Sequence, residues 1–172
     1  LLNHGGTEMG QGLHTKVAQT VADAFGLDMG AVRVSTTDTA RVPNTSATAA
    51  SSGSDLNCMA ALDAATAIRQ RLTDFAANEY GVDPARIRFD NAQVYVGRRT
   101  LSFAELVHAA YMARISLSAT GFYRTPKIHY DKASMSGRPF YYFAYGVAAT
   151  EVAVDTLTLG GSMSLTGDNA DL

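Results

Sequence analysis

The sequence predicts an α+β fold in which helices pack on a mixed β-sheet. Two long stretches repeat apolar residues at helical spacing, and several short stretches alternate apolar with polar residues. Hydrophobic residues make up 47% of the 172 positions, so the chain can bury a core. We expect helices over residues 13–25, 55–80 and 102–112, and strands over residues 31–36, 87–89, 94–96 and 140–159.

The first predicted helix follows from one apolar stripe. Leu13, Val17, Val21 and Phe25 are spaced four apart, and Gly26 follows as a residue that ends helices. Beyond it, residues 31–36 alternate apolar and polar side chains and are interpreted as a half-buried strand.

A second, longer helix is predicted over residues 55–80, with Gly81 as its end and Asp83-Pro84 as a break. Many alanines in this stretch allow close packing. The side chains expected to face inward are those of Met59, Ile68, Leu72 and Phe75.

The remaining elements are shorter. The alternating stretches 87–89 and 94–96 predict a hairpin with its turn at residues 90–92. Ser102 and Glu105 have the spacing of a capping box, so a helix should begin there and run to about Met112. Residues 116–121 are predicted to be extended, and the aromatic and β-branched run 140–159 to form a long strand.

Composition excludes several classes of protein. A net charge of −2 with no basic cluster argues against a nucleic-acid partner. No apolar run is long enough to span a membrane. The single cysteine, Cys58, excludes an internal disulfide framework and fits a reducing compartment, so we expect a cytoplasmic protein.

Two loops poor in large side chains, residues 4–12 and 43–55, each lead directly into a predicted helix. Backbone N–H groups at a helix start favour anions, and small side chains allow a ligand to approach the backbone. The Gln11 carboxamide would suit a ligand with amide-like edges, such as a pterin. The alternatives are an ordinary tight turn at the first loop and helix capping by Ser54 or Asp55 at the second.

Other chemistry is less well supported by the sequence. The glycine spacing of the first loop matches neither a Walker A loop nor a Rossmann fingerprint. The spacing of His4, Glu8 and His14 matches no standard zinc site, so no metal-ligating side chain is assigned. Glu8 and Glu151 could act as general bases, but we interpret both as surface or supporting carboxylates and assign no catalytic residue.

Four segments in order resemble one family. Residues 5–16, Gly-Gly-Thr-Glu-Met-Gly-Gln-Gly-Leu-His-Thr-Lys, resemble the glycine-rich cofactor loop of the xanthine dehydrogenase/aldehyde oxidase family. Residues 43–57, 118–126 and 139–146 are similar to further segments of that family, in matching order and spacing to about Leu157. The resemblance implies that residues 1–157 are part of a molybdenum-cofactor-binding domain and that residues 158–172 are a divergent or truncated tail.

The resemblance also implies an activity. Enzymes of the resembled family hydroxylate purines such as hypoxanthine and xanthine with oxygen from water. Their electrons leave the molybdenum-molybdopterin cofactor through 2Fe-2S clusters and FAD. We expect those two cofactors in other regions of a large subunit or in a partner subunit. We also expect this chain to be inactive alone, because the family's base lies in a Gly-Glu-Pro-Pro type motif that the sequence lacks.

The resemblance assigns cofactor contacts to five residues, chiefly through backbone N–H groups and the carboxamide of Gln11. These residues are Met9, Gly10, Gln11, Ala50 and Ser51. Two residues near these positions differ from the family's pattern. Cys58 occupies a position where glycine is expected, and Gly53 occupies one where relatives carry serine. The alternative functions are a stand-alone pterin- or nucleotide-binding module and a purely structural domain.

Overall fold

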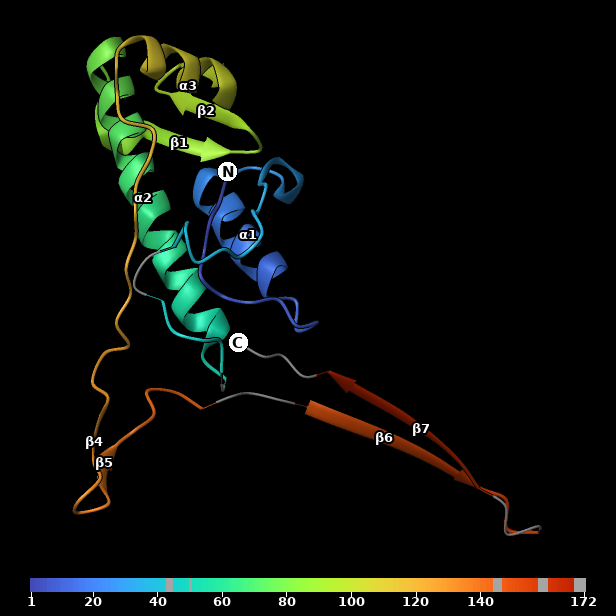
Figure 1. Cartoon of the computed structure of the whole chain (residues 1–172). Helices are drawn as coiled ribbons and strands as arrows, with labels where there is room; N and C mark the ends of the chain where they lie inside the picture. The colour runs from blue at the N-terminus through green and yellow to red at the C-terminus, as the bar shows by residue number, and fades with distance from the viewer. Residues whose placement is uncertain (43–44, 50, 144–146, 158–160, 169–172) are drawn as a thin grey trace. The chain divides into compact units, whose positions relative to one another are not determined.

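The computed structural model describes residues 1–42, 45–49, 51–143, 147–157 and 161–168. The chain divides into two compact units, Leu1–Arg124 and Thr125–Leu172, which are described separately. In the first unit, the long helix α2 (Gly53–Tyr80) lies against α1 (Leu13–Phe25) toward one end and against β1, β2 and α3 toward the other (Figure 1).

The first helix forms as its apolar stripe predicts. Leu13 and Val17 are completely buried, and Phe25 is buried at the other end of α1. Gly26 ends the helix with a φ of 61°, a left-handed conformation that favours glycine. A Cβ at Gly26 would lie 2.7 Å from the backbone oxygen of Phe89, so this glycine also allows the helix end to approach the hairpin.

The long helix α2 buries alanines and, of the large residues expected to face inward, Leu72. Its buried side chains are those of Ala61, Ala65, Leu72, Ala76 and Ala77. Ile68 and Phe75 pack against the core while partly buried, but Met59 is 41% exposed, so its predicted inward position is wrong. Met59 lies on a different helix face from Ala61, which packs against Leu13 and Val17 of α1, and the sequence pattern alone did not distinguish the two faces.

The predicted hairpin is confirmed and extended by a third strand. β1 (Ile87–Asp90) pairs antiparallel with β2 (Gln93–Val96), and β2 pairs with β3 (Arg99–Ser102). Asn91 and Ala92 form the first turn with φ values of 51° and 58°. Positive φ at both central residues is typical of a type I′ turn, so the hairpin forms without a glycine there.

The predicted capping box is present at the start of α3 (Phe103–Met112). The Ser102 hydroxyl accepts a hydrogen bond from the Glu105 backbone N–H at 3.2 Å, and the Glu105 carboxylate accepts one from the Ser102 N–H at 2.7 Å. The hydrogen bonds from Ser102 keep the pKa of Glu105 below its ordinary value. α3 therefore starts where the sequence predicted.

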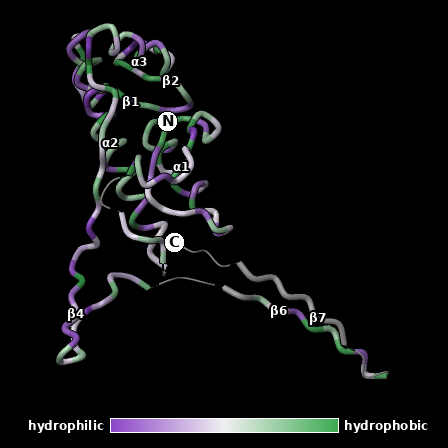
Figure 2. The backbone as a smooth tube through the Cα atoms, viewed as in Figure 1, coloured by the Kyte–Doolittle hydropathy of each residue, from purple (hydrophilic) through white to green (hydrophobic). Residues whose placement is uncertain are grey.

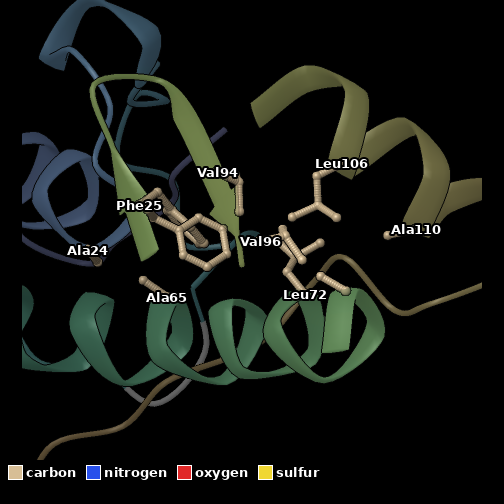
Figure 3. Close-up of a cluster of buried hydrophobic side chains, with 10 residues drawn as sticks. Ala24, Phe25, Ala65, Leu72, Val94, Val96, Leu106 and Ala110 are labelled. Carbon is tan, nitrogen blue, oxygen red and sulfur yellow. The ribbon is translucent and has the colours of Figure 1, made fainter. Parts of the chain in front are cut away.

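The main core lies between the three-stranded sheet and the helices α2 and α3. Figure 3 shows Val94 and Val96 of β2 meeting Leu72 of α2 and Leu106 of α3, with Phe25 of α1 beside them. Leu72, Val94, Val96 and Leu106 are each at most 1% exposed. Burying such side chains contributes about 1.5–3 kcal/mol each to folding, so this cluster holds the two ends of the unit together.

The strand predicted over residues 31–36 does not form. Residues Met29–Ala31 form the 3-10 turn η1, and Val34 makes only an isolated parallel bridge with Leu2. The Leu2 N–H donates to the Arg33 carbonyl at 2.9 Å, and the Ser35 N–H donates to the Leu2 carbonyl at 3.0 Å. The alternation was real, but a strand needs a partner along its length, and among the described residues only Leu2 provides one.

The segment 116–121 is extended, as predicted, and the structure places it along α2 without joining it to a sheet. Arg71 of α2 donates to the backbone carbonyls of Ser116 and Ser118, and Asp63 accepts from the Phe122 N–H at 3.1 Å. A Cβ at Gly121 would lie 1.9 Å from the carbonyl oxygen of Ala60. Glycine is therefore required where this segment touches the helix backbone.

The second unit consists of two antiparallel hairpins. β4 (His129–Asp131) pairs with β5 (Ser136–Arg138), and β6 (Val147–Val154) pairs along its whole length with β7 (Gly161–Asp168). β6 is mostly apolar (Figure 2). The strand predicted over 140–159 is thus shorter than expected: β6 covers only eight residues of it, residues 141–142 form a bend, and 144–146 and 158–160 lie outside the described residues.

Together these elements confirm the α+β class. The described strands pair antiparallel in small sheets, and the Leu2–Val34 bridge is parallel. Within the part of the chain that the structure describes, no helix combines the length and the apolar character needed to cross a membrane.

Candidate functional site

The first loop presents an open glycine surface just before α1. Gly10 and Gly12 have φ values of 101° and 75°, and a Cβ built at either would have no atom within 4 Å. These two glycines are therefore required by the left-handed backbone and not by packing. Met9, between Glu8 and Gly10, is 68% exposed. This side of the loop is accessible to a large ligand.

Glu8 occupies the N-terminal end of α1. One carboxylate oxygen accepts from the N–H groups of Gly10 and Gly12 at 2.9 and 3.0 Å, and the other accepts from the His14 N–H at 2.9 Å. These backbone hydrogen bonds, that from His14 foremost, keep the pKa of Glu8 below its ordinary value of 4.5. The positive end of α1 is already compensated by this carboxylate, so it is not a free anion site.

Gln11 closes the tip of the same loop. Its carboxamide oxygen accepts from the Met9 N–H at 2.6 Å, and its amide nitrogen donates to the Thr7 carbonyl at 2.9 Å. A carboxamide has two N–H donors and two lone pairs on oxygen. The carboxamide oxygen can therefore accept one more hydrogen bond, and the amide nitrogen can donate one more. An amide-like ligand edge requires one such donor and one such acceptor.

His4 anchors the beginning of the loop from inside. It is 7% exposed, its Nδ1 accepts from the Gly6 N–H at 3.2 Å, and its ring meets that of His14 edge-on with centroids 4.9 Å apart. Burial, and then the neighbouring His14, lower the pKa of His4 below its ordinary value of 6.5. The hydrogen bond from Gly6 requires an unprotonated Nδ1, so His4 supports the loop in its neutral form.

The second loop lies directly against the first. The Thr7 N–H donates to the Thr48 hydroxyl at 2.8 Å. A Cβ at Gly5 would lie 2.1 Å from the hydroxyl oxygen of Thr45, so the backbone of one loop touches a side chain of the other. The Thr37 hydroxyl also donates to the Gly6 carbonyl at 2.9 Å. Two segments about 40 residues apart in sequence thus form one surface.

The start of α2 completes this surface. The helix begins at Gly53 with Ser52 as its N-cap residue, and the Ser52 side chain makes no capping hydrogen bond. Capping by Ser54 or Asp55, the alternative considered for this loop, is therefore not what the structure shows, because both residues lie within the helix. Asn57 donates to the Gly53 carbonyl at 2.7 Å, and a Cβ at Gly6 would lie 2.7 Å from the same Asn57 nitrogen.

The structure brings together the two loops that carry the predicted cofactor contacts. Met9 and Gly10 are exposed, Gln11 is half-buried, and Ser51 is exposed one residue before the N-cap of α2. Ala50 lies outside the described residues. Cys58 is half-buried against the cluster of Leu13 and Val17, as a small packing residue would be.

Two residues that build this surface were not assigned a role in it from sequence. Glu8 was weighed as a metal ligand and as a base and interpreted as a surface or supporting carboxylate, although an acidic residue a few positions before a helix is a signal for binding the helix N–H groups. Thr48 was one of many hydroxyl residues in its loop. No pattern in the sequence singles it out, because its partner Thr7 is far away in the chain.

The surface can hold a large polar cofactor but does not assemble protein ligands for a metal ion. In the described ranges, no group of three or more His, Cys, Asp or Glu side chains is placed to bind one. The joined loops, the open glycine backbone and the remaining hydrogen-bonding capacity of Gln11 fit a flat cofactor that exposes amide-like edges and brings its own metal.

Comparison with known proteins agrees with this chemistry. A family model described as a molybdopterin cofactor-binding domain matches residues 1–162. Over 158 residues, 92% of the chain, the sequence is 47% identical to a xanthine dehydrogenase of Oryza sativa subsp. japonica and 44% identical to a xanthine dehydrogenase/oxidase of Felis catus. The chain spans about a tenth of the length of these curated relatives.

Two solved structures share the fold. Quinoline 2-oxidoreductase from Pseudomonas putida 86 matches 94% of the chain with a TM-score of 0.67, and the Cu,Mo-CO dehydrogenase matches 72% with a TM-score of 0.63. Both are 22% identical in sequence, and the match covers 20% and 17% of their respective chains. The chain therefore shares the fold of a segment of each of these two larger chains.

Proposed function

Because the chain belongs to the molybdopterin cofactor-binding domain family, we propose that its two joined loops form part of the wall that holds molybdopterin in a xanthine dehydrogenase-type enzyme. The observation that carries this proposal is the Thr7–Thr48 hydrogen bond, which unites the loops into one surface. The residues proposed to touch the cofactor are Met9, Gly10, Gln11, Ala50 and Ser51.

Within this proposal, Gln11 and Glu8 have different tasks. Gln11 holds the loop tip through Met9 and Thr7 and offers its remaining donor and acceptor to the cofactor. Glu8 fixes the backbone behind Gly10 and Gly12 and neutralises the end of α1. A loop fixed in advance costs less conformational entropy on binding, which strengthens the hold on the cofactor.

When bound, the cofactor supplies the redox chemistry for hydroxylation with oxygen from water. The chain supplies position: the remaining donor and acceptor of the Gln11 carboxamide orient a polar ligand without offering a competing base near it, while the Met9 and Gly10 N–H groups already donate to Gln11 and Glu8. The one carboxylate of the first loop, Glu8, is engaged by three backbone N–H groups, so it does not serve as the proton acceptor.

The finer parts of the proposal concern the whole enzyme. We propose that purines are its substrates, that 2Fe-2S clusters and FAD lie in other regions or a partner subunit, and that the enzyme is cytoplasmic. Residues 1–157 are proposed as the cofactor-domain segment. The 172-residue chain alone is proposed to be inactive, because it has no Gly-Glu-Pro-Pro type segment. Turnover of xanthine by the purified chain would contradict that last point.

Calorimetry of the 172-residue chain tests the proposal against a stand-alone nucleotide-binding module. We expect saturable heat with molybdopterin and none with adenosine or guanosine nucleotides. The Gln11→Ala variant should lose one or two hydrogen bonds of about 0.5–1.5 kcal/mol each and bind molybdopterin more weakly. Tight nucleotide binding without pterin binding would favour the module instead.

A further inference from the structure

A positively charged cavity lies at the far end of α2 and shares no residue with the two cofactor loops. It has a volume of about 350 Å³ and is lined by the C-terminal turn of α2, the 3-10 turn η2 (Pro84–Arg86) and the turn between β2 and β3. Sites for small molecules have volumes of about 300–1,000 Å³. The cavity is therefore large enough for a small ligand.

Three arginines supply the charge of this cavity. Arg86, Arg98 and Arg99 are all exposed, and no Asp or Glu side chain lines the cavity with them. None of the three forms an ion pair within the described part of the chain. Arg99 lies over the ring of Tyr80 at 5.4 Å, which leaves the edge of its guanidinium for a further partner.

The segments that carry these arginines are fixed relative to one another. The Gly97 N–H donates to the Arg86 carbonyl at 3.4 Å, and Gly97 has a φ of 64° beside Val82. Val96, which forms part of the floor, is 1% exposed and belongs to the main core. The cavity thus has a rigid apolar base beneath a charged rim.

Arg88 on the neighbouring strand shows how an arginine is neutralised in this sheet. Its guanidinium pairs with Asp90 and stacks over Tyr95 at 4.3 Å, and the hydrogen bond to Asp90 raises its pKa. No such carboxylate serves the cavity arginines. The negative end of α2 near Tyr80 offsets only about half a charge, which is less than the three positive charges present.

We propose that this cavity binds a small anion carrying two or more phosphate or carboxylate groups, held by Arg86, Arg98 and Arg99. Guanidinium groups match the oxygens of such anions in paired hydrogen bonds, and several of them together favour a multiply charged ligand. This anion site goes beyond the cofactor proposal and does not depend on it.

The test is a titration of the ¹⁵N-labelled 172-residue chain with pyrophosphate and, in a second arm, with citrate, both at constant ionic strength. We expect saturable shifts of the Val82, Gly97 and Arg99 amide signals at concentrations below about 1 mM for at least one of the two anions. The preferred anion identifies phosphate or carboxylate as the natural chemistry.

Variants separate a built site from general attraction to positive charge. Arg98→Gln and Arg86→Gln should each weaken binding at least about tenfold. The matched control Arg88→Gln removes the same charge outside the cavity and should leave affinity within about twofold. All three side chains are exposed, and unchanged thermal midpoints would show that folding is retained.

Two outcomes would overturn the anion site. One is that neither pyrophosphate nor citrate gives saturable shifts. The other is an equal loss of affinity in Arg88→Gln and Arg98→Gln, which would mean that net charge and not the cavity attracts the anion.

Discussion

The backbone N–H of Thr7 donates a hydrogen bond to the hydroxyl of Thr48 at 2.8 Å, and this hydrogen bond joins the two loops that precede α1 and α2. The contact of Gly5 with Thr45 lies beside it. The proposed cofactor surface exists because these loops meet, so the first prediction concerns this bond.

Thr48→Val removes the acceptor while keeping the shape of the side chain. We expect the free energy of unfolding to fall by about 0.5–1.5 kcal/mol and hydrogen exchange of the Thr7 amide to accelerate. Thr66→Val, at an exposed position of α2, is the matched control and should change neither. Unchanged exchange at Thr7 in Thr48→Val would show that the loops are held together by other contacts.

Replacing Glu8 tests whether its carboxylate fixes the first loop. The pKa of Glu8 is lowered, so the unfolded state binds its proton more readily than the folded state does. Its contribution to stability should be complete above pH 4.5 and should be lost as pH falls through the lower pKa of the folded state.

Glu8→Gln should therefore unfold at a lower temperature than wild type at neutral pH, and the difference should shrink in acid. Thermal melts of both proteins across this range measure it. Glu79→Gln, at an exposed position of α2, provides the control. A temperature difference that stays constant with pH would contradict the role assigned to the charge.

His4 predicts a second, separate pH dependence. Burial lowers its pKa and His14 lowers it further, while the side-chain hydrogen bond with Asn57 and then the charge of Glu8 act in the opposite direction. The stability that neutral His4 provides should be complete above pH 6.5 and should decline as pH falls from there toward the lower pKa of the folded state. His4→Asn keeps an acceptor near the Gly6 N–H but does not titrate, so this decline should disappear.

The measurement is the free energy of unfolding in urea at several pH values between about 7.5 and 5.5. His108→Asn, at an exposed position of α3, should retain the wild-type decline. If His4→Asn follows the same curve as wild type, another group causes the pH dependence.

Gly121→Ala tests the contact of the extended segment with α2. The added Cβ would meet the Ala60 carbonyl oxygen at 1.9 Å, so we expect a loss of about 1–3 kcal/mol in the free energy of unfolding. Gly53→Ala is the control, since its Cβ would have ordinary contacts with Leu13 at 3.7 Å or more. Equal stability of Gly121→Ala and wild type would mean that the segment is not held against the helix.

The local structure of the first unit could largely be predicted from sequence. The stripe of Leu13 and Val17 and the pairing of Ser102 with Glu105 are signals contained within one element, and each forms as expected. The strand predicted over 31–36 was wrong because whether a strand finds a pairing partner depends on the whole fold and not on its own alternation. The position of Met59 was predicted wrongly because the buried face of α2 consists mainly of alanines, so the large residues of this helix do not by themselves mark it.

The site was only partly predictable, because some of its contacts join segments that are far apart in the sequence. Glycine at positions 10 and 12 and the carboxamide of Gln11 can be recognised from the loop alone, and the structure shows them on an open surface. The acceptor role of Glu8 and the contact between Thr7 and Thr48 depend on how the chain returns to the first loop. These contacts make the surface rigid, and they cannot be inferred from spacing.

Amide shift mapping of the ¹⁵N-labelled chain with molybdopterin tests the central claim most directly. The account predicts that signals from residues 9–12 and 45–52 shift together and saturate at the same ligand concentration, because one surface binds one molecule. Shifts confined to one of these loops, or saturating at different concentrations, would contradict a shared cofactor surface.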